Sequence, residues 1–159
     1  MRAAVLTLVL ATMALAGFPG PLHAEPITRS RIEVIDGDTI RVDGQPVRLL
    51  GLNAPETGER ASCDVERRAG EAAKRLLQAL VAEGGLDVRF GPCACRPGTE
   101  GTPLCNYGRR CAAMWAQGSD VARSLIRARL AVPFECTARR CAPMQRPWCR
   151  GSNGRSAPP

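Results

Sequence analysis

Alternating apolar and polar residues predict three short β-strands in the first half of the chain. The three runs cover residues 31–35, 39–42 and 47–52. The first two alternate, and the third is more continuously apolar, as in a strand that is buried on both faces. The pairs Asp36-Gly37 and Asp43-Gly44 separate the runs, and Asp-Gly favours a tight hairpin turn because glycine readily adopts positive φ. We therefore expect a three-stranded meander.

A helical period follows the third strand. Seven apolar residues recur at the spacing of one helix face: Val65, Ala69, Ala72, Ala73, Leu76, Leu77 and Leu80. Ser62 is a candidate N-cap because its hydroxyl can accept from a free backbone amide in the first turn. The pair Gly84-Gly85 marks the expected end of this helix.

Two further strands and a second helix complete the predicted order. Residues 86–90 and 109–115 alternate, and a loop rich in Gly, Pro and Cys over residues 91–106 joins them. Ser119 is a candidate cap for a helix whose apolar face is Val121, Ala122, Leu125 and Ile126. The order β-β-β-α-β-β-α predicts an α+β, mainly β, fold. Five short strands with a helix after the third suit the OB-fold, a small, partly open barrel.

The first 24 residues have the pattern of a secretory signal peptide. Arg2 precedes an uncharged, largely apolar run over residues 3–16, and the small residue Ala24 offers a cleavage point before Glu25. The alternative is an uncleaved anchor, although the run is shorter than the roughly 20 apolar residues that a membrane span needs. We expect cleavage, a secreted or periplasmic bacterial protein, and no stable membrane insertion afterwards.

Charge and composition divide the remaining chain into a domain over residues 25–135 and a tail over 136–159. Residues 25–109 carry a net charge of −1, whereas residues 110–159 carry +7. A basic end suggests a polyanionic partner such as nucleic acid, anionic lipid or cell-wall polymer, or simply aids solubility. The tail is rich in Cys, Arg and Pro without a helix or strand period, and we expect its last residues, 151–159, to be disordered.

The cysteine and histidine content restricts the chemistry. All eight cysteines follow the signal segment, and an even number in an exported protein indicates disulfides, with 105 possible pairings. A zinc site is the rival interpretation, but the single-residue gap between Cys93 and Cys95 is too short for the usual ligand spacing. The only histidine, His23, lies in the signal segment, which excludes Ser-His-Asp and Cys-His catalysis and histidine metal sites. Carboxylates, arginines, a metal, or a lysine or cysteine nucleophile remain.

Three clusters carry candidate chemistry. They read Ile-Asp-Gly-Asp-Thr at residues 35–39, Val-Arg-Leu-Leu-Gly-Leu-Asn-Ala-Pro-Glu at 47–56, and Asn-Tyr-Gly-Arg at 106–109. Each cluster alone fits an ordinary turn or surface charge. In this order, with a helix between the second and the third, they resemble the nuclease domain of the staphylococcal-nuclease (thermonuclease) family over roughly residues 32–134.

The resemblance implies calcium-assisted hydrolysis of phosphodiester bonds in DNA or RNA. By it, Arg48 and Arg109 contact the scissile phosphate, and Glu56 acts as the general base or positions the attacking water. Asp38 matches a calcium ligand, and Asp36 is a nearby carboxylate. These residue types suit the reaction, because a guanidinium makes paired hydrogen bonds to phosphate oxygens and calcium prefers oxygen ligands.

The sequence departs from the family pattern around the implied metal. Asn53 stands where the family has a second calcium aspartate, and Ala54, whose carbonyl is a further candidate ligand, stands where threonine is frequent. Because Asn53 supplies an oxygen without a charge, we expect calcium to bind weakly. Metal affinity should therefore rise in Asn53→Asp.

Substrate contacts depart from the pattern as well. Tyr107 matches a tyrosine that touches nucleotide phosphate, but Asn106 replaces a frequent lysine. The aromatics expected after the second helix are missing, with Phe134 and Trp148 as candidate substitutes. In the basic tail, Arg139, Arg140, Arg146 and Arg150 lie among cysteines and are candidates for contact with the nucleic-acid backbone, or they merely accompany a stapled C-terminus.

Three functions remain open on these grounds. The first is an exported sugar-non-specific nuclease that acts as a monomer and prefers single strands. The second is a nuclease-like module that binds nucleic acid without cutting it, because its metal site is impaired at Asn53. The third is an envelope protein whose basic tail binds an anionic polymer. The joint presence of Arg48, Glu56 and Arg109 favours the enzyme, since a binder has no need of the glutamate.

Overall fold

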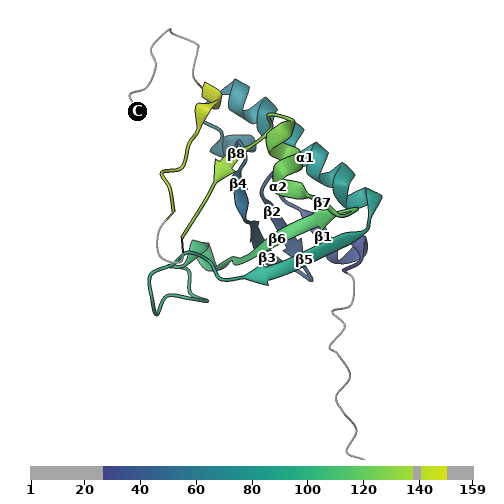
Figure 1. Cartoon of the computed structure of the whole chain (residues 1–159). Helices are drawn as coiled ribbons and strands as arrows, with labels where there is room; N and C mark the ends of the chain where they lie inside the picture. The colour runs from purple at the N-terminus through teal and green to yellow at the C-terminus, as the bar shows by residue number, and fades with distance from the viewer. Residues whose placement is uncertain (1–26, 138–140, 150–159) are drawn as a thin grey trace, which may run out of the picture.

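A curled sheet and two helices form the body of the protein in a computed structural model, which describes residues 27–137 and 141–149 (Figure 1). The fold is α+β and mainly β, as the residue pattern predicts. The helices are α1 (Asp64–Glu83) and α2 (Val121–Arg127), and both pack against the sheet. The signal segment, Arg139, Arg140 and the residues from 150 onward lie outside the described part of the chain.

The sheet has six strands in the order β1-β2-β3-β6-β5, with β7 paired to β6. The strands are β1 (Ile32–Val34), β2 (Thr39–Val42), β3 (Gln45–Leu49), β5 (Leu86–Gly91), β6 (Arg110–Ala116) and β7 (Ser119–Asp120). The predicted meander β1-β2-β3 is confirmed, and β3 pairs with β6 in parallel. Thr39 therefore lies opposite Arg48, and Arg48 opposite Cys111, which sets three residues side by side across the sheet.

The predicted third strand is wrong in one respect, because it breaks into two. Gly51 has φ +86° and redirects the chain, so β3 ends at Leu49 and β4 (Gly51–Asn53) pairs with β8 (Val132–Phe134) in a separate two-stranded sheet. A positive φ is costly for residues with a side chain, which is why the bend falls on glycine. The break moves Asn53 away from the main sheet and next to the C-terminal segment.

The two Asp-Gly pairs have different roles. Asp43 and Gly44 have φ of 51° and 78°, as the predicted tight hairpin turn requires. Asp36-Gly37 also lies between two antiparallel strands, but the tight form of its predicted turn is wrong, because neither residue adopts positive φ and the connection covers residues 35–38. Gly37 is needed for space, since a Cβ there would lie 2.6 Å from the Cβ of Ala73 on α1.

Both helix caps lie one residue later than predicted. Cys63 caps α1, and the amide of Ser62 instead donates to Glu66 Oε2 at 2.7 Å. Asp120 caps α2 by accepting from the amide of Arg123 at 2.8 Å, because Ser119 is part of β7. A carboxylate is favoured at this position by the helix dipole. Helix α1 ends at Glu83, before Gly84, as expected.

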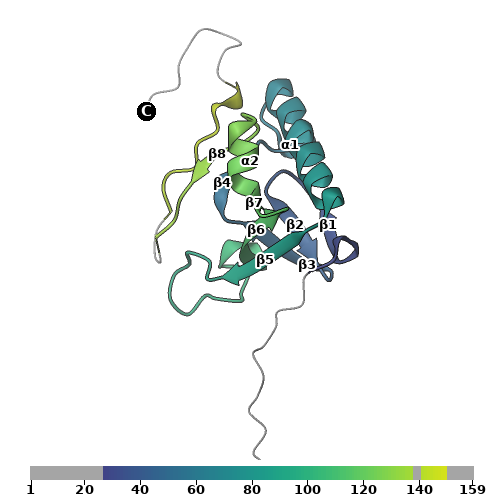
Figure 2. The same cartoon turned by 45° about the vertical axis from the view of Figure 1, so that its right-hand side comes forward.

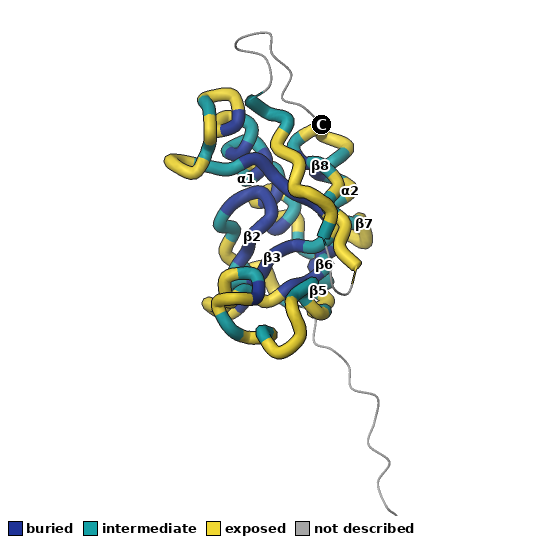
Figure 3. The backbone as a smooth tube through the Cα atoms, turned by 90° about the vertical axis from the view of Figure 1, so that its left-hand side faces the viewer, coloured by how far each residue is buried: buried dark blue, intermediate teal, exposed yellow. Residues whose placement is uncertain are grey.

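The core lies between the helices and the strands β2, β3 and β6, which are the most buried part of the chain (Figure 3). The buried positions of α1 are Glu66, Gly70, Ala73, Leu77 and Val81. This face differs from the predicted one at the start of the helix, where Val65 is 53% exposed. A carboxylate and a glycine therefore occupy the buried face of the first two turns.

All eight cysteines form disulfides: Cys63–Cys149, Cys93–Cys111, Cys95–Cys105 and Cys136–Cys141. The predicted disulfides are confirmed, and no cysteine is left to ligate zinc. Four disulfides fit an extracellular or periplasmic location, where the environment is oxidising. Within the described ranges, neither helix combines the length and apolarity that a bilayer span requires.

Candidate functional site

Arg48 lies at the centre of the candidate site, on β3. Its side chain is nearly buried and forms an ion pair with Asp38. Its Nη2 also donates to the carbonyl of Leu52 at 3.1 Å and to Asn53 Oδ1 at 3.2 Å. The guanidinium is therefore held by β4 and by the loop before β2, so its position is fixed before any ligand arrives.

The Asp38 carboxylate is satisfied at both oxygens. Oδ1 pairs with Arg48 and accepts from the Thr39 hydroxyl at 3.1 Å, and Oδ2 accepts from the Ala54 amide at 2.8 Å. Burial raises the pKa of Asp38 and outweighs the opposing effect of Arg48, while the nearby Asp36 raises it further. The amide of Ala54 thus faces this carboxylate.

Arg60 joins the two other carboxylates of the site. The buried Asp36 accepts from the Asp38 amide at 3.1 Å and from Arg60 Nη2 at 2.9 Å. Arg60 Nε also lies 3.3 Å from Glu56 Oε2. Asp36, Asp38 and Glu56 therefore belong to one connected network, and each of them faces an arginine.

Helix α1 positions the backbone of Glu56. Gly70 packs directly on this backbone, because a Cβ there would clash with the Glu56 carbonyl and lie 2.8 Å from the Pro55 oxygen. The Glu56 amide points toward Glu66 Oε1 at 3.5 Å. The Glu56 side chain stays 32% exposed, so the carboxylate can reach solvent from a fixed backbone.

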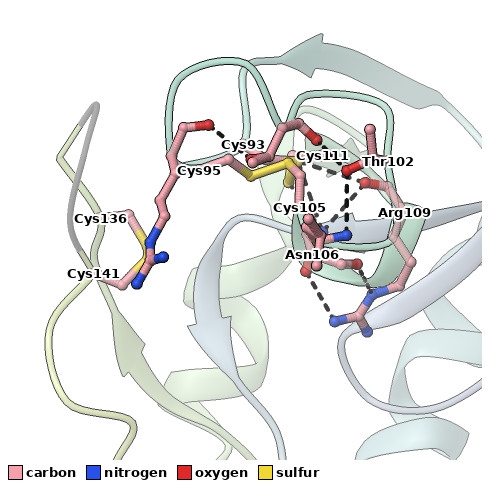
Figure 4. Close-up of a disulfide and its surroundings, with 12 residues drawn as sticks. Cys93, Cys95, Thr102, Cys105, Asn106, Arg109, Cys111, Cys136 and Cys141 are labelled. Atoms are coloured by element: carbon pink, nitrogen blue, oxygen red, sulfur yellow. Dashed lines mark hydrogen bonds between the residues drawn. A yellow bond between two sulfur atoms is a disulfide. The ribbon is translucent and has the colours of Figure 1, made fainter.

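Two disulfides and an asparagine hold Arg109 (Figure 4). The side chain donates to the Asn106 carbonyl at 3.1 Å, to Asn106 Oδ1 at 2.9 Å and to the Thr39 hydroxyl at 3.2 Å. Burial lowers the pKa of Arg109, and the neighbouring Arg48 acts in the same direction. Cys105 and Cys111 flank this segment and tie it to the loop after β5.

The tyrosine motif lies in a turn just before β6, and Arg109, the expected first residue of this strand, lies one residue before it. Asn106–Gly108 forms a short 3₁₀ turn before β6, and Asn106 and Tyr107 both have positive φ. Tyr107 is 85% exposed, and its ring centroid lies 5.5 Å from the Arg109 guanidinium. The ring is therefore available to a ligand that reaches Arg109.

Arg48 and Arg109 line the same cavity of about 720 Å³. Its wall is largely apolar and includes Leu50, Tyr107 and Phe134, whose ring centroid lies 5.9 Å from the Arg48 guanidinium. Glu56 does not line this cavity among the described residues, and it connects to Arg48 through Arg60, Asp36 and Asp38 in turn. The two arginines thus share an opening, with the glutamate at the far end of the network.

Residues 141–149, here called the C-terminal arm, run back beside β8 and end against the start of α1 (Figure 2). Asn53 Nδ2 donates to the Gln145 carbonyl at 3.0 Å. Arg146 donates to Glu66 Oε1 at 3.3 Å from Nε and at 3.1 Å from Nη2, which lies 4.0 Å from Glu56 Oε1. The Cys63–Cys149 disulfide fixes the end of the arm at the start of α1.

No protein-family model matches this chain, and no curated protein matches it. What the site can bind therefore has to be argued from its geometry.

The candidate calcium ligands fit a hard cation in kind but are engaged by protein donors. The four oxygens of Asp36 and Asp38 and the Oδ1 of Asn53 each have a partner, as given above. In the described part of the chain, no three Asp, Glu, Cys or His residues form a group arranged for a metal. A cation would therefore compete with Arg48 and Arg60 for these carboxylates.

Sequence reasoning missed three residues of this network and misjudged a fourth. Arg60 and Glu66 were not singled out, and Arg146 was considered only as one basic residue of the tail. For Glu66 a signal existed, because positions 66, 70, 73 and 77 form one helical stripe. Asn106, noted only as a missing lysine, orients Arg109.

Proposed function

We propose that this protein is an exported nuclease that hydrolyses phosphodiester bonds of DNA or RNA. The observation that supports this most is the pair Arg48, on β3, and Arg109, just before the neighbouring strand β6, because both line one cavity. Both guanidinium groups are held by side-chain and backbone acceptors before a substrate arrives. Preorganised cations of this kind stabilise the charge that develops on a phosphoryl group.

The proposed mechanism assigns each residue one task. Arg48 and Arg109 bind the phosphoryl oxygens of the scissile group and stabilise their negative charge in the transition state. Glu56, which lies outside that cavity but is partly exposed, would orient the attacking water and accept its proton. Tyr107, and Arg139 and Arg140 of the tail, contact the strand beyond the scissile phosphate.

The proposed cofactor is weakly bound calcium. Asp36 and Asp38, with the side-chain oxygen of Asn53 and the carbonyl of Ala54, would hold it. When bound, it would polarise a phosphoryl oxygen as a Lewis acid. Weak binding follows from the arginines that already neutralise both carboxylates.

The proposed fold family is the OB-fold, in the form found in the staphylococcal-nuclease family. The path β1-β2-β3-β6-β5 supplies five strands that curl as a partly open barrel does, and the site lies on it. A cavity lined by two arginines and two aromatic rings suits a single strand, whose bases and backbone are both accessible. We propose that the protein acts as a monomer.

A second candidate is a module of the same shape that binds nucleic acid without cutting it. Asn53 and the arginine partners of every site carboxylate favour this alternative, because both weaken a metal site. The two functions share the phosphate contacts and differ in whether Glu56 and a cation can act.

One experiment separates the two. The oxidised protein without residues 1–24 is incubated with single-stranded DNA and calcium, with and without chelator, beside the variants Glu56→Ser and Arg109→Ala. We expect cutting by the parent protein that chelator abolishes, and a loss of at least a hundredfold in both variants, since single catalytic groups contribute about 10²–10⁴-fold. Binding without fragments at any calcium concentration would support the second candidate.

A further inference from the structure

We infer that Arg146 is a substrate-binding residue, which the C-terminal arm holds beside Glu56 to contact a backbone phosphate of the bound strand. This inference rests on the proposed function. It concerns a residue more than 80 positions from Glu56 in the sequence, and it starts from the way the arm is attached.

The arm is fixed to three parts of the site. It meets Asn53 after β4 through the Gln145 carbonyl, Glu66 on α1 through Arg146, and Cys63 through a disulfide. These three contacts lie within five residues of the arm, from 145 to 149. The arm is thus attached to β4, to α1 and to the residue that caps α1.

Glu66 explains why Arg146 is held so firmly. This carboxylate is only 1% exposed, and it accepts from the Ser62 amide and faces the Glu56 amide. A buried charge is costly unless a partner neutralises it, and Arg146 is that partner among the described residues. Glu66 therefore contacts the backbone of the loop that carries Glu56, and it also fixes the position of Arg146.

The Arg146 side chain nevertheless remains 43% exposed. Its Nη2 lies 4.0 Å from the Glu56 carboxylate, so its positive charge adjoins the proposed catalytic group and faces solvent. An exposed guanidinium with a fixed stem is suited to a mobile phosphate, because little side-chain freedom is lost on binding.

Asn53 has a specific part in this arrangement. Its Oδ1 accepts from Arg48 while its Nδ2 donates to Gln145, and it is 3% exposed. An aspartate offers acceptors only and could not make the second bond. The asparagine thus links the first phosphate-binding arginine to the arm that carries Arg146.

The test measures binding of a fluorescent single-stranded oligonucleotide over a range of salt concentrations, with calcium chelated. Arg146→Gln is compared with the parent protein and with Arg67→Gln, which removes an exposed arginine paired to Asp64 on the same helix. We expect about tenfold weaker binding at low salt for Arg146→Gln and no change for Arg67→Gln. The slope of log affinity against log salt should fall by about 0.7, the value for one phosphate contact on a single strand.

A double variant separates phosphate contact from a structural role, because Arg146→Gln leaves Glu66 without its cation. In Glu66→Gln with Arg146→Gln the buried charge is also removed. Binding that stays tenfold weaker supports the inference, and binding that returns to the parent value overturns it, as does an unchanged salt slope in Arg146→Gln. If the parent protein binds no nucleic acid, the proposed function fails instead.

Discussion

Asn53→Asp tests two roles of this position, as a metal ligand and as the residue that bonds the C-terminal arm. Asn53 matches a metal ligand by resemblance, yet in the structure its amide bonds Arg48 and the Gln145 carbonyl. The substitution adds a carboxylate beside Arg48, which also pairs with Asp38, and it removes one donor. It should therefore strengthen cation binding and loosen the C-terminal arm at the same time.

The magnitudes follow from the contacts. A carboxylate about 4 Å from a divalent cation gains several kcal/mol of attraction at an effective dielectric constant near 20, much of which desolvation offsets. We expect calcium affinity to rise about tenfold or more. Loss of the bond to Gln145 costs about 1 kcal/mol, because that carbonyl belongs to an exposed residue and water can replace the donor.

Two measurements check this prediction beside a matched control. Calorimetric titration gives the calcium affinity, and hydrogen exchange over residues 141–149 reports whether the arm is docked. Asn106→Asp is the control, since it makes the same change beside Arg109, where no calcium ligand is proposed. Equal calcium affinity in the two variants would refute the assignment of Asn53 to the metal position. Unchanged exchange would refute its role in docking the arm.

Two further predictions concern how α1 supports the site. Gly70→Ala should lower the free energy of unfolding by roughly 1 kcal/mol, because the added methyl group clashes with the Glu56 and Pro55 backbone at a cost of about 1–3 kcal/mol. This cost outweighs the gain in helix propensity of up to about 1 kcal/mol. Urea denaturation measures the difference, and an unchanged or higher stability would contradict the prediction. Burial by itself raises the pKa of Glu66, but the Ser62 and Glu56 amides and Arg146 outweigh it and lower the pKa below its ordinary value of 4.5. Because the folded-state pKa is depressed, this stabilisation is present above about pH 4.5 and is lost as the pH falls below it. If the free energy of unfolding falls by the same amount between about pH 7 and about pH 3 in the parent protein and in Glu66→Gln, the assignment is refuted.

Local signals in the sequence were sufficient to predict those strands, turns and helix ends that depend on neighbouring residues alone. The alternation of residues 39–42, the Asp43-Gly44 turn and the end of α1 at Gly84 all follow from the immediate neighbours. The even number of cysteines, together with the expected export, predicted disulfides, and all eight cysteines form them. The pairing itself was not accessible, since it depends on which loops the fold brings together.

The contacts between distant segments were the part that sequence could not supply. Gly37 reads as a turn residue, and only the position of α1 reveals that it makes room for Ala73. From the sequence, Glu66 is a favourable charge in the first turn of a helix, and only the structure shows that it is buried and paired with Arg146 of the C-terminal arm. Arg60 reads as a loop residue until Asp36 and Glu56 are seen on either side of it.

The charges of the network explain why the asparagine and the arm belong together. Four carboxylates, at Asp36, Asp38, Glu56 and Glu66, face the four guanidinium groups of Arg48, Arg60, Arg109 and Arg146 within the described chain, so the network is formally neutral. A divalent cation alone would leave two uncompensated positive charges, and a phosphodiester alone would leave one negative charge. Because the charges of the two ligands together nearly cancel, we expect calcium to bind along with the strand more readily than it binds first. An aspartate at position 53 would shift that balance toward the free cation, and it would also loosen the arm at Gln145, although the Cys63–Cys149 disulfide would still hold its end.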